Sequence, residues 1–305
     1  MERKYEKYAK EIPIQGRRGT MALWALMDRD FFGWDSFSIR YGLVDGEGVI
    51  PEETEKLHTH DYDQILWFLS SDPKDVLELG AEVEATMGEE LTRRRFTEPT
   101  AILIPAGTPH FSPIVRQLSR PIYFMSVNCT GSLSAAVADE NAIQGAGPWA
   151  GFMGPYARNF TTLTWARRGA YHYGSEHDSN SGGVYTGVMG GGAVKIPLMT
   201  TWQTITLPHE LGPLRPSDGK GHPHVHADYD EALIFLSMDN ANLTDLHGEA
   251  DFCFGEDGED QEHCIVTKAA AMLQPRGVWH LPLTFNKVDP EYPMVFLNIS
   301  RHDPK

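Results

Sequence analysis

The chain has 305 residues, 41% of them hydrophobic, which is enough for two medium domains that each bury a core. Its 26 Lys and Arg residues face 42 Asp and Glu residues, and the formal net charge of −16 disfavours nucleic acid and anionic membranes as main partners. No apolar run approaches the roughly 18 residues that a membrane-spanning helix requires.

The cysteines and the start of the chain bear on the compartment. Cys129, Cys253 and Cys264 form an odd, sparse set that does not indicate a disulfide framework. The charged opening residues lack the apolar core of a signal peptide. We therefore expect a cytoplasmic protein that acts on a small molecule, with neither nucleic acid nor membrane as a partner; a homodimer stays open.

Short strands separated by Gly, Pro and Asp turns follow one another along the chain. Alternating polar and apolar residues predict strands at 36–41 ("SFSIRY") and 202–209 ("WQTITLPH"), and apolar runs predict buried strands such as 121–128 and 293–300. Helical periodicity is confined to the opening residues and to 130–142. This order predicts an all-β fold built from sandwiches or barrels.

The chain also repeats itself. The segment "HTHDYDQILWFLS" from His58 recurs as "HVHADYDEALIFLS" from His224, and "IPAGTPH" ending at His110 recurs as "QPRGVWH" ending at His280. Trp34 pairs with Trp202 at a similar shift. We therefore expect an N-terminal domain over 1–130, a connecting segment over 131–185 that packs on the barrels, and a C-terminal domain over 186–305.

Each repeat carries a candidate metal site. His-x-His on one strand presents two imidazoles to the same side, and a Pro-x-Gly turn about fifty residues later delivers a third. The predicted ligands are His58, His60, Gln64 and His110 in the first repeat and His224, His226, Glu231 and His280 in the second. Three imidazoles and one oxygen ligand suit a divalent transition metal with open positions.

These two motifs resemble the paired motifs of the cupin superfamily. "GKGHPHVHADYDE" with "QPRGVWH" matches the cupin ligand positions well, and "EKLHTHDYDQ" with "IPAGTPH" matches them with Gln64 in place of the carboxylate. The resemblance implies a bicupin, that is, two double-stranded β-helix (jelly-roll) barrels in one chain. The asparagine often found after the last histidine is missing in both repeats.

The reaction is less constrained than the fold. Three histidines and a glutamate suit Fe²⁺ first, with Mn²⁺, Ni²⁺ or Zn²⁺ as alternatives, so a dioxygenase-type oxidoreductase is the first expectation. A redox-neutral isomerase or decarboxylase/lyase is the alternative, and a binding or storage protein is the second. Glu231 and Arg276 are the catalytic candidates, although Arg276 also fits a solvated turn residue.

Overall fold

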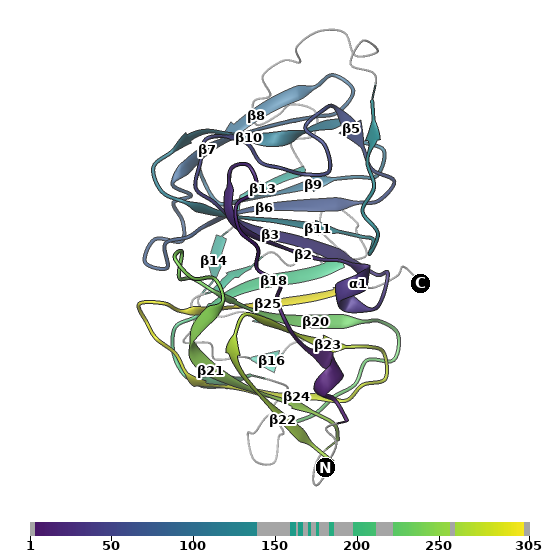
Figure 1. The fold of residues 1–305 in the computed structure, drawn as a ribbon, viewed down its shortest axis with the longest axis vertical. Helices are drawn as coiled ribbons and strands as arrows, with labels where there is room; N and C mark the ends of the chain where they lie inside the picture. The colour runs from purple at the N-terminus through teal and green to yellow at the C-terminus, as the bar shows by residue number, and fades with distance from the viewer. Residues whose placement is uncertain are drawn as a thin grey trace. The chain divides into compact units, whose positions relative to one another are not determined.

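The computed structural model describes residues 4–138, 159–162, 164–166, 170–171, 175–176, 183–185, 198–211, 222–256 and 260–301. The chain forms two compact units, one built mainly from residues 13–163 and one from residues 164–189 and 197–305 together with the first twelve residues. Each unit is a pair of antiparallel sheets closed around an apolar core, so we call them barrel 1 and barrel 2 (Figure 1). The prediction of an all-β jelly-roll fold is confirmed.

Barrel 1 consists of two facing sheets. The first has the order β13-β9-β6-β11-β3-β2, with bounds Phe160–Thr162, Thr100–Ile104, Gln64–Ser70, Ile122–Asn128, Ser38–Val44 and Met21–Met27. The second has the order β12-β5-β10-β7-β8, with β4 beside β10, and bounds Ala136–Val137, His58–Thr59, His110–Leu118, Ala81–Met87, Thr92–Phe96 and Gly48–Val49. The inward side chains of both sheets, among them Phe68, Val83 and Phe124, form one core.

Barrel 2 has the same plan. Its first sheet has the order β1-β23-β20-β25-β18-β17-β14, with bounds Ala9–Glu11, Ala270–Gln274, Glu231–Ser237, Met294–Arg301, Leu198–Ile205, Gly183–Tyr185 and Thr164–Ala166. Its second has the order β19-β24-β21-β22, with bounds His209–Leu211, His280–Lys287, Asp245–Phe254 and Glu262–Lys268. A separate short pair joins β15 (Ala170–Tyr171) to β16 (Ser175–Glu176).

The opening residues correct the predicted domain boundary. Strand β1 pairs with β23, and Tyr5, next to the short 3-10 helix η1 (Glu6–Tyr8), stacks on Phe254 with ring centroids 5.7 Å apart. The start of the chain therefore completes barrel 2, whereas the sequence placed it in the N-terminal domain. A three-residue strand and a single aromatic contact are too short to give a periodic pattern in the sequence, so the sequence did not indicate this pairing.

The connecting segment contributes strands where it is described. Strand β13 extends barrel 1 through β9, and β14 and β17 extend barrel 2 through β18. Residues 139–158 and several later stretches of this segment lie outside the described residues. The predicted helix over 130–142 is wrong where it is described, because β12 pairs there with β5.

Strand register confirms most of the internal repeat. His58 is paired with His110 and His224 with His280, while Gln64 faces Ile104 and Asn128 just as Glu231 faces Gln274 and Ser300. The match of Trp34 with Trp202 is wrong, because Met125 of β11 faces Tyr41 and the equivalent Leu297 of β25 faces Trp202. Trp34 instead follows a single helical turn, α1 (Arg29–Phe32), that ends at the left-handed Gly33.

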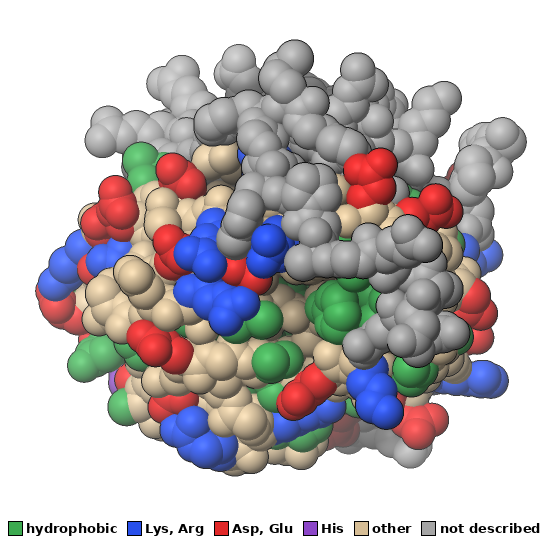
Figure 2. Space-filling view, turned by 90° about the horizontal axis from the view of Figure 1, so that it is seen from above, with side chains coloured by type: hydrophobic (Ala, Val, Ile, Leu, Met, Phe, Trp, Pro, Cys, Tyr) green, Lys and Arg blue, Asp and Glu red, His purple; other side chains and the backbone are tan. Residues whose placement is uncertain are grey.

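The surface carries both signs of charge. Figure 2 shows one face of the molecule on which Lys and Arg side chains gather beside Asp and Glu side chains rather than forming a field of one sign. Among the described residues, no helix is both long and apolar enough to cross a membrane.

Candidate metal centres

The predicted ligands of barrel 2 come together in the structure. Ligand atoms of His224, His226, Glu231 and His280 all lie within 4.8 Å of one another. Glu231 Oε2 is 3.1 Å from His280 Nε2 and 3.3 Å from His226 Nε2, and the Nε2 atoms of His224 and His226 are 3.1 Å apart. A cis pair of ligands bound at about 2.1 Å is separated by about 3 Å, so the spacing fits one cation among them.

The first predicted centre is also assembled. His58, His60 and His110 bring their ligand atoms within 4.8 Å of one another, and all three are buried. Their Nε2 atoms are buried without a hydrogen-bond partner in the described structure. Buried polar atoms left unsatisfied are costly, and three lone pairs that converge in this way suit a metal ion.

Backbone carbonyls fix which nitrogen of each ring carries the proton. The Nδ1 atoms of His58, His60 and His110 donate to the carbonyls of Lys56, Ser134 and Thr108 at 2.7, 2.6 and 2.9 Å. His280 Nδ1 donates to Val278 in the same way at 2.9 Å. With the proton on Nδ1, each Nε2 presents a lone pair to the centre, as a metal ligand must.

Burial disfavours the charged form of two barrel 1 imidazoles, those of His58 and His110. Desolvation, reinforced by the neighbouring His58 ring, lowers the pKa of His110 to about 3. Desolvation also lowers the pKa of His58. A neutral imidazole is the form that ligates a transition metal, so the lowered pKa values of His58 and His110 favour a cation over protons at these two rings.

Gln64 is the predicted oxygen ligand of barrel 1, and its amide is held by the neighbouring side chains. Its Nε2 lies 3.1 Å from each of three acceptors, Glu52 Oε1, Ser126 Oγ and Asn128 Oδ1, which share its two hydrogens. Its Oε1 is buried and has no partner among the described residues. Three acceptors thus fix the amide, and the carbonyl oxygen remains for the metal.

The shell around Glu231 has the opposite polarity. Asn298 donates from Nδ2 to Glu231 Oε1 at 2.9 Å, and Asn298 stands at the place that Ser126 occupies in barrel 1. A donor faces the carboxylate of barrel 2, whereas acceptors face the amide nitrogen of barrel 1. Each ligand is therefore matched to its own neighbours.

Barrel 1 holds a buried ionic group that the sequence reasoning missed. Arg40, on the inward face of β3, donates from Nη2 to Glu53 Oε1 at 2.6 Å, and its Nε and Nη1 are buried without partners in the described structure. Glu52 lies next to Gln64, and desolvation together with the charge of Glu53 raises its pKa to about 7. A cation with unused donors and a carboxyl of raised pKa thus stand beside the candidate metal ligands.

Two tyrosines also belong to the centres. Tyr62 stacks on His60 with ring centroids 4.7 Å apart, and Tyr229 stacks on His226 at 4.3 Å. Both tyrosines stand in an Asp-Tyr-Asp sequence that follows each His-x-His pair, so their recurrence was visible in the sequence. The stacking restrains one imidazole of each centre.

Arg276 is not brought into the barrel 2 centre. Its Nη2 lies 3.5 Å from Asp230 Oδ2, and its side chain is 51% exposed. The backbone amide of Arg276 donates to the same Asp230, and Ala106 and Asp63 make the equivalent contact in barrel 1. The contact therefore serves the shared Pro-x-Gly turn.

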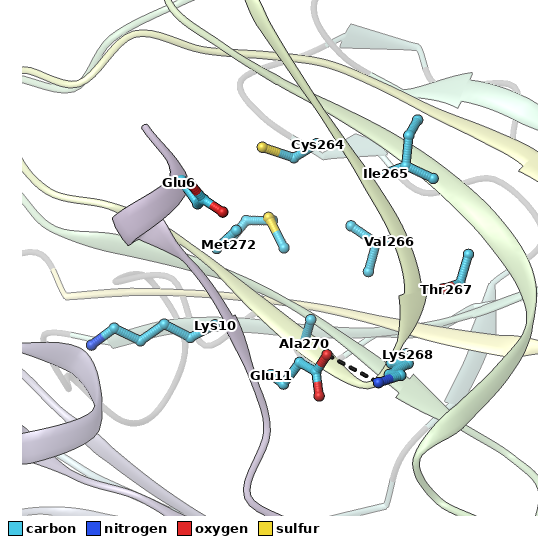
Figure 3. A pocket seen from close by; sticks show the side chains of 11 residues that line it. Glu6, Lys10, Glu11, Cys264, Ile265, Val266, Thr267, Lys268, Ala270 and Met272 are labelled. Carbon is cyan, nitrogen blue, oxygen red and sulfur yellow. Dashed lines mark hydrogen bonds and ion pairs between the residues drawn. The ribbon is translucent and has the colours of Figure 1, made fainter. Parts of the chain in front are cut away.

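A cavity in barrel 2 lies away from the histidines. It encloses about 270 Å³ between the opening residues and the β22–β23 hairpin (Figure 3). Cys264, Val266 and Met272 form its apolar part, and Glu11 pairs with Lys268 at 3.2 Å at its edge. None of the predicted metal ligands lines it.

The double-sheet barrels have the jelly-roll architecture of the cupin fold, and the convergent histidines form two groups that could each hold a metal ion. No family model and no curated protein sequence matches the chain. Its structure is similar to oxalate decarboxylase: one such structure has a TM-score of 0.58 and 12% identity, with 97% of this chain and 77% of that chain covered. A variant of the Bacillus subtilis enzyme gives 0.58 and 11% over the same shares of the two chains.

A third similar structure comes from work on the Mn(II) centres of the Bacillus subtilis oxalate decarboxylase. It has a TM-score of 0.56 and 12% identity, with 97% of this chain and 78% of that chain covered. Identities this low establish the fold alone. The histidine clusters support a divalent transition metal, and the expectation of Fe²⁺ and of dioxygenase chemistry is not confirmed.

Proposed function

We propose that the protein is a metal-dependent decarboxylase of a small carboxylic acid and that turnover takes place in barrel 1. One observation carries the proposal: the unused donors of Arg40 and the carboxyl of Glu52 lie in the same barrel interior as three histidines with converging lone pairs. The similarity to oxalate decarboxylase, a carboxylate-cleaving enzyme by name, supports the choice of reaction.

The residues of barrel 1 divide the work of such a reaction. His58, His60, His110 and Gln64 would hold the metal, which when bound supplies a Lewis acid that polarises a substrate oxygen. Mn²⁺ is our first choice, because the similar enzyme has Mn(II) centres. Arg40 would bind a carboxylate through Nη1 or through Nε, the donors that Glu53 does not use.

Glu52 would then handle the proton. Loss of CO₂ leaves an electron pair on the adjacent carbon, which must accept a proton. Glu52 Oε2 is buried without a partner in the described structure, whereas Oε1 accepts from Gln64. A neutral carboxyl at this place can donate its proton to that carbon and recover it from solvent later.

Barrel 2 lacks this group where the two can be compared. The position equivalent to Arg40 by strand register is Thr201, which faces Asn298 as Arg40 faces Ser126. The proposal thus places turnover in barrel 1, at the centre that contains Gln64. The charge of the fourth ligand alone would favour the barrel 2 centre, which contains Glu231. Barrel 2 would bind its metal firmly through the carboxylate and serve stability or regulation.

Product analysis of the full chain loaded with Mn²⁺ tests the proposal. Small mono- and dicarboxylic acids are offered, and CO₂ release and net oxygen consumption are measured together. We expect CO₂ release without stoichiometric oxygen consumption, and loss of turnover in Arg40→Met with the metal content unchanged. Oxygen consumed in proportion to product would instead support the dioxygenase reading.

A further inference from the structure

A third group of metal-ligating side chains lies in barrel 2, outside the histidine centre. Asp251 and Cys253 are on β21, on the opposite face from the core residues Phe252 and Phe254, and His263 faces Cys253 from β22 (Figure 1). Their ligand atoms all lie within 4.8 Å of one another. Strand alternation and one cross-strand pair bring the three together.

The group is compact and only partly exposed. His263 Nδ1 lies 2.9 Å from Asp251 Oδ2 and 3.4 Å from Cys253 Sγ. The Cys253 residue is 3% exposed, and the side chains of Asp251 and His263 are 21% and 59% exposed. Asp251 Oδ1 is buried and has no hydrogen-bond partner among the described residues. One side of the group is thus accessible, while its sulfur and one carboxylate oxygen are sheltered.

The equivalent place in barrel 1 shows what this position needs. Glu84 stands there by register, and Arg116 and Arg95 neutralise its carboxylate at 2.8 and 2.9 Å. The residues of barrel 2 equivalent to these arginines are Asn286 and Ile265, neither of which is cationic. Asp251 thus keeps the place of Glu84 without its two arginines, and a bound cation would supply the positive charge that they supply in barrel 1.

The three residues do not form a nucleophilic triad. A triad needs the thiol and the carboxylate on different nitrogens of the imidazole, but here Nδ1 faces both. Burial, reinforced by Asp251, also raises the pKa of the Cys253 thiol. A thiol of this kind is not activated for attack.

We propose that Asp251, Cys253 and His263 form a third metal site, which takes a zinc-type divalent cation. One thiolate, one imidazole and one carboxylate form a donor set typical of Zn²⁺, with a fourth position left for water on the exposed side. The cation replaces the two arginines of barrel 1 and ties β21 to β22, the last strand of its sheet. Its binding displaces the thiol proton to solvent.

Cobalt substitution of the full-length protein tests this site separately from the two histidine centres. Neither histidine centre includes a cysteine, so a thiolate-to-Co²⁺ charge-transfer band reports on the third site alone. We expect the band to account for one of the Co²⁺ ions bound per chain, the others occupying the histidine centres without a sulfur band, and Zn²⁺ to abolish it by competition. Cys253→Ser should lose the band, while Cys264→Ser and Cys129→Ser should keep it.

His263→Gln is the second variant, because an exposed side chain can be replaced without harm to the core. Loss of this ligand should weaken Co²⁺ binding by about tenfold or more, read from the same band. Absence of a sulfur band at saturating Co²⁺, its persistence in Cys253→Ser, or unchanged affinity in His263→Gln would each overturn the proposal. None of these readouts depends on the reaction proposed for barrel 1.

Discussion

The two histidine centres share a scaffold and differ in what surrounds it. In both, a His-x-His pair meets a histidine delivered by a Pro-x-Gly turn, and the turn amide donates to the second histidine's carbonyl, Gly107 to His60 and Gly277 to His226. The predicted fourth ligand is a buried amide, Gln64, in barrel 1 and a buried carboxylate, Glu231, in barrel 2. Duplicated backbone geometry therefore leaves the chemistry of each centre to a few neighbouring side chains.

Those neighbours change together with the ligand. Gln64 donates to Ser126 and Asn128, whereas Glu231 accepts from Asn298, which replaces Ser126. Barrel 1 carries Arg40, where barrel 2 has Thr201 by register, together with Glu52 and Glu53, and an amide ligand tolerates these two carboxyl groups better than another anion would. We therefore expect barrel 1 to bind its metal less tightly than barrel 2, because its fourth ligand is an amide and its interior holds other charged groups.

The largest expected effect separates the two centres by their histidines. His110→Ala should remove the barrel 1 metal and lower CO₂ release by about 10³-fold or more, because the Lewis acid is lost. His280→Ala should remove one metal equivalent and leave most of the turnover. Elemental analysis and product assays on both variants check this, and the reverse pattern would move turnover to Glu231.

The next effect concerns the buried carboxyl of barrel 1. Glu52→Gln keeps the shape and the contact with Gln64 but cannot donate a proton, so CO₂ release should fall by about 10²–10⁴-fold with the metal content unchanged. Glu249→Gln is the matched control. Glu249 lies on β21, in the second sheet of barrel 2, so this variant should leave turnover unaltered. Equal activity of the Glu52 variant and the parent would remove Glu52 from the reaction.

The ligands were predictable from the sequence because their spacing is local. His-x-His fixes two side chains on one strand, and Pro-x-Gly fixes the turn before the third, so short motifs determine geometry that the barrels later bring together. The ordered repeat also predicted two barrels and most of their register. It failed at Trp34, where a matching residue type had no matching strand.

The charged interior of barrel 1 could not be predicted in the same way. Arg40 lies in "SFSIRY", which reads as an ordinary alternating strand, and its partner Glu53 comes from a loop. Their contact depends on the closure of the barrel, and no spacing encodes it. Strand β1 was not predicted for the same reason. It has only three residues, which are too few for a periodic pattern, and it pairs with β23, which is distant in the sequence.

A smaller effect on stability tests whether Gln64 and the side chains that contact its amide must be replaced together. Gln64→Glu alone places a carboxylate against the acceptor oxygens of Glu52 and Asn128, so the metal-free protein should lose about 3 kcal/mol of stability. Adding Ser126→Asn and Asn128→Ser, which copies barrel 2, should recover part of this loss. Thermal unfolding of chelator-treated protein measures both, and an unchanged single variant would contradict the coupling.

The smallest expected effect concerns the second sheet of each barrel, where Glu84 of barrel 1 is equivalent to Asp251 of barrel 2. Hydrogen bonds from Arg116 and Arg95 lower the pKa of Glu84 below its ordinary value of 4.5. The ion pairs of Glu84 with the two arginines therefore contribute their full stability above pH 4.5. This contribution is lost as the pH falls through the lowered pKa of Glu84 in the folded state.

Glu84→Gln should accordingly lower the melting temperature at pH 7 by about 3 °C, which corresponds to roughly 1 kcal/mol for a pair with exposed arginines. The difference between variant and parent should shrink as the pH falls well below 4.5, since the parent carboxyl is then protonated too. A difference that stayed constant over this range would mean that Glu84 acts through packing alone. In that case Arg95 and Arg116 would not stabilise Glu84 through charge, and the absence of equivalent arginines near Asp251 would carry no electrostatic meaning.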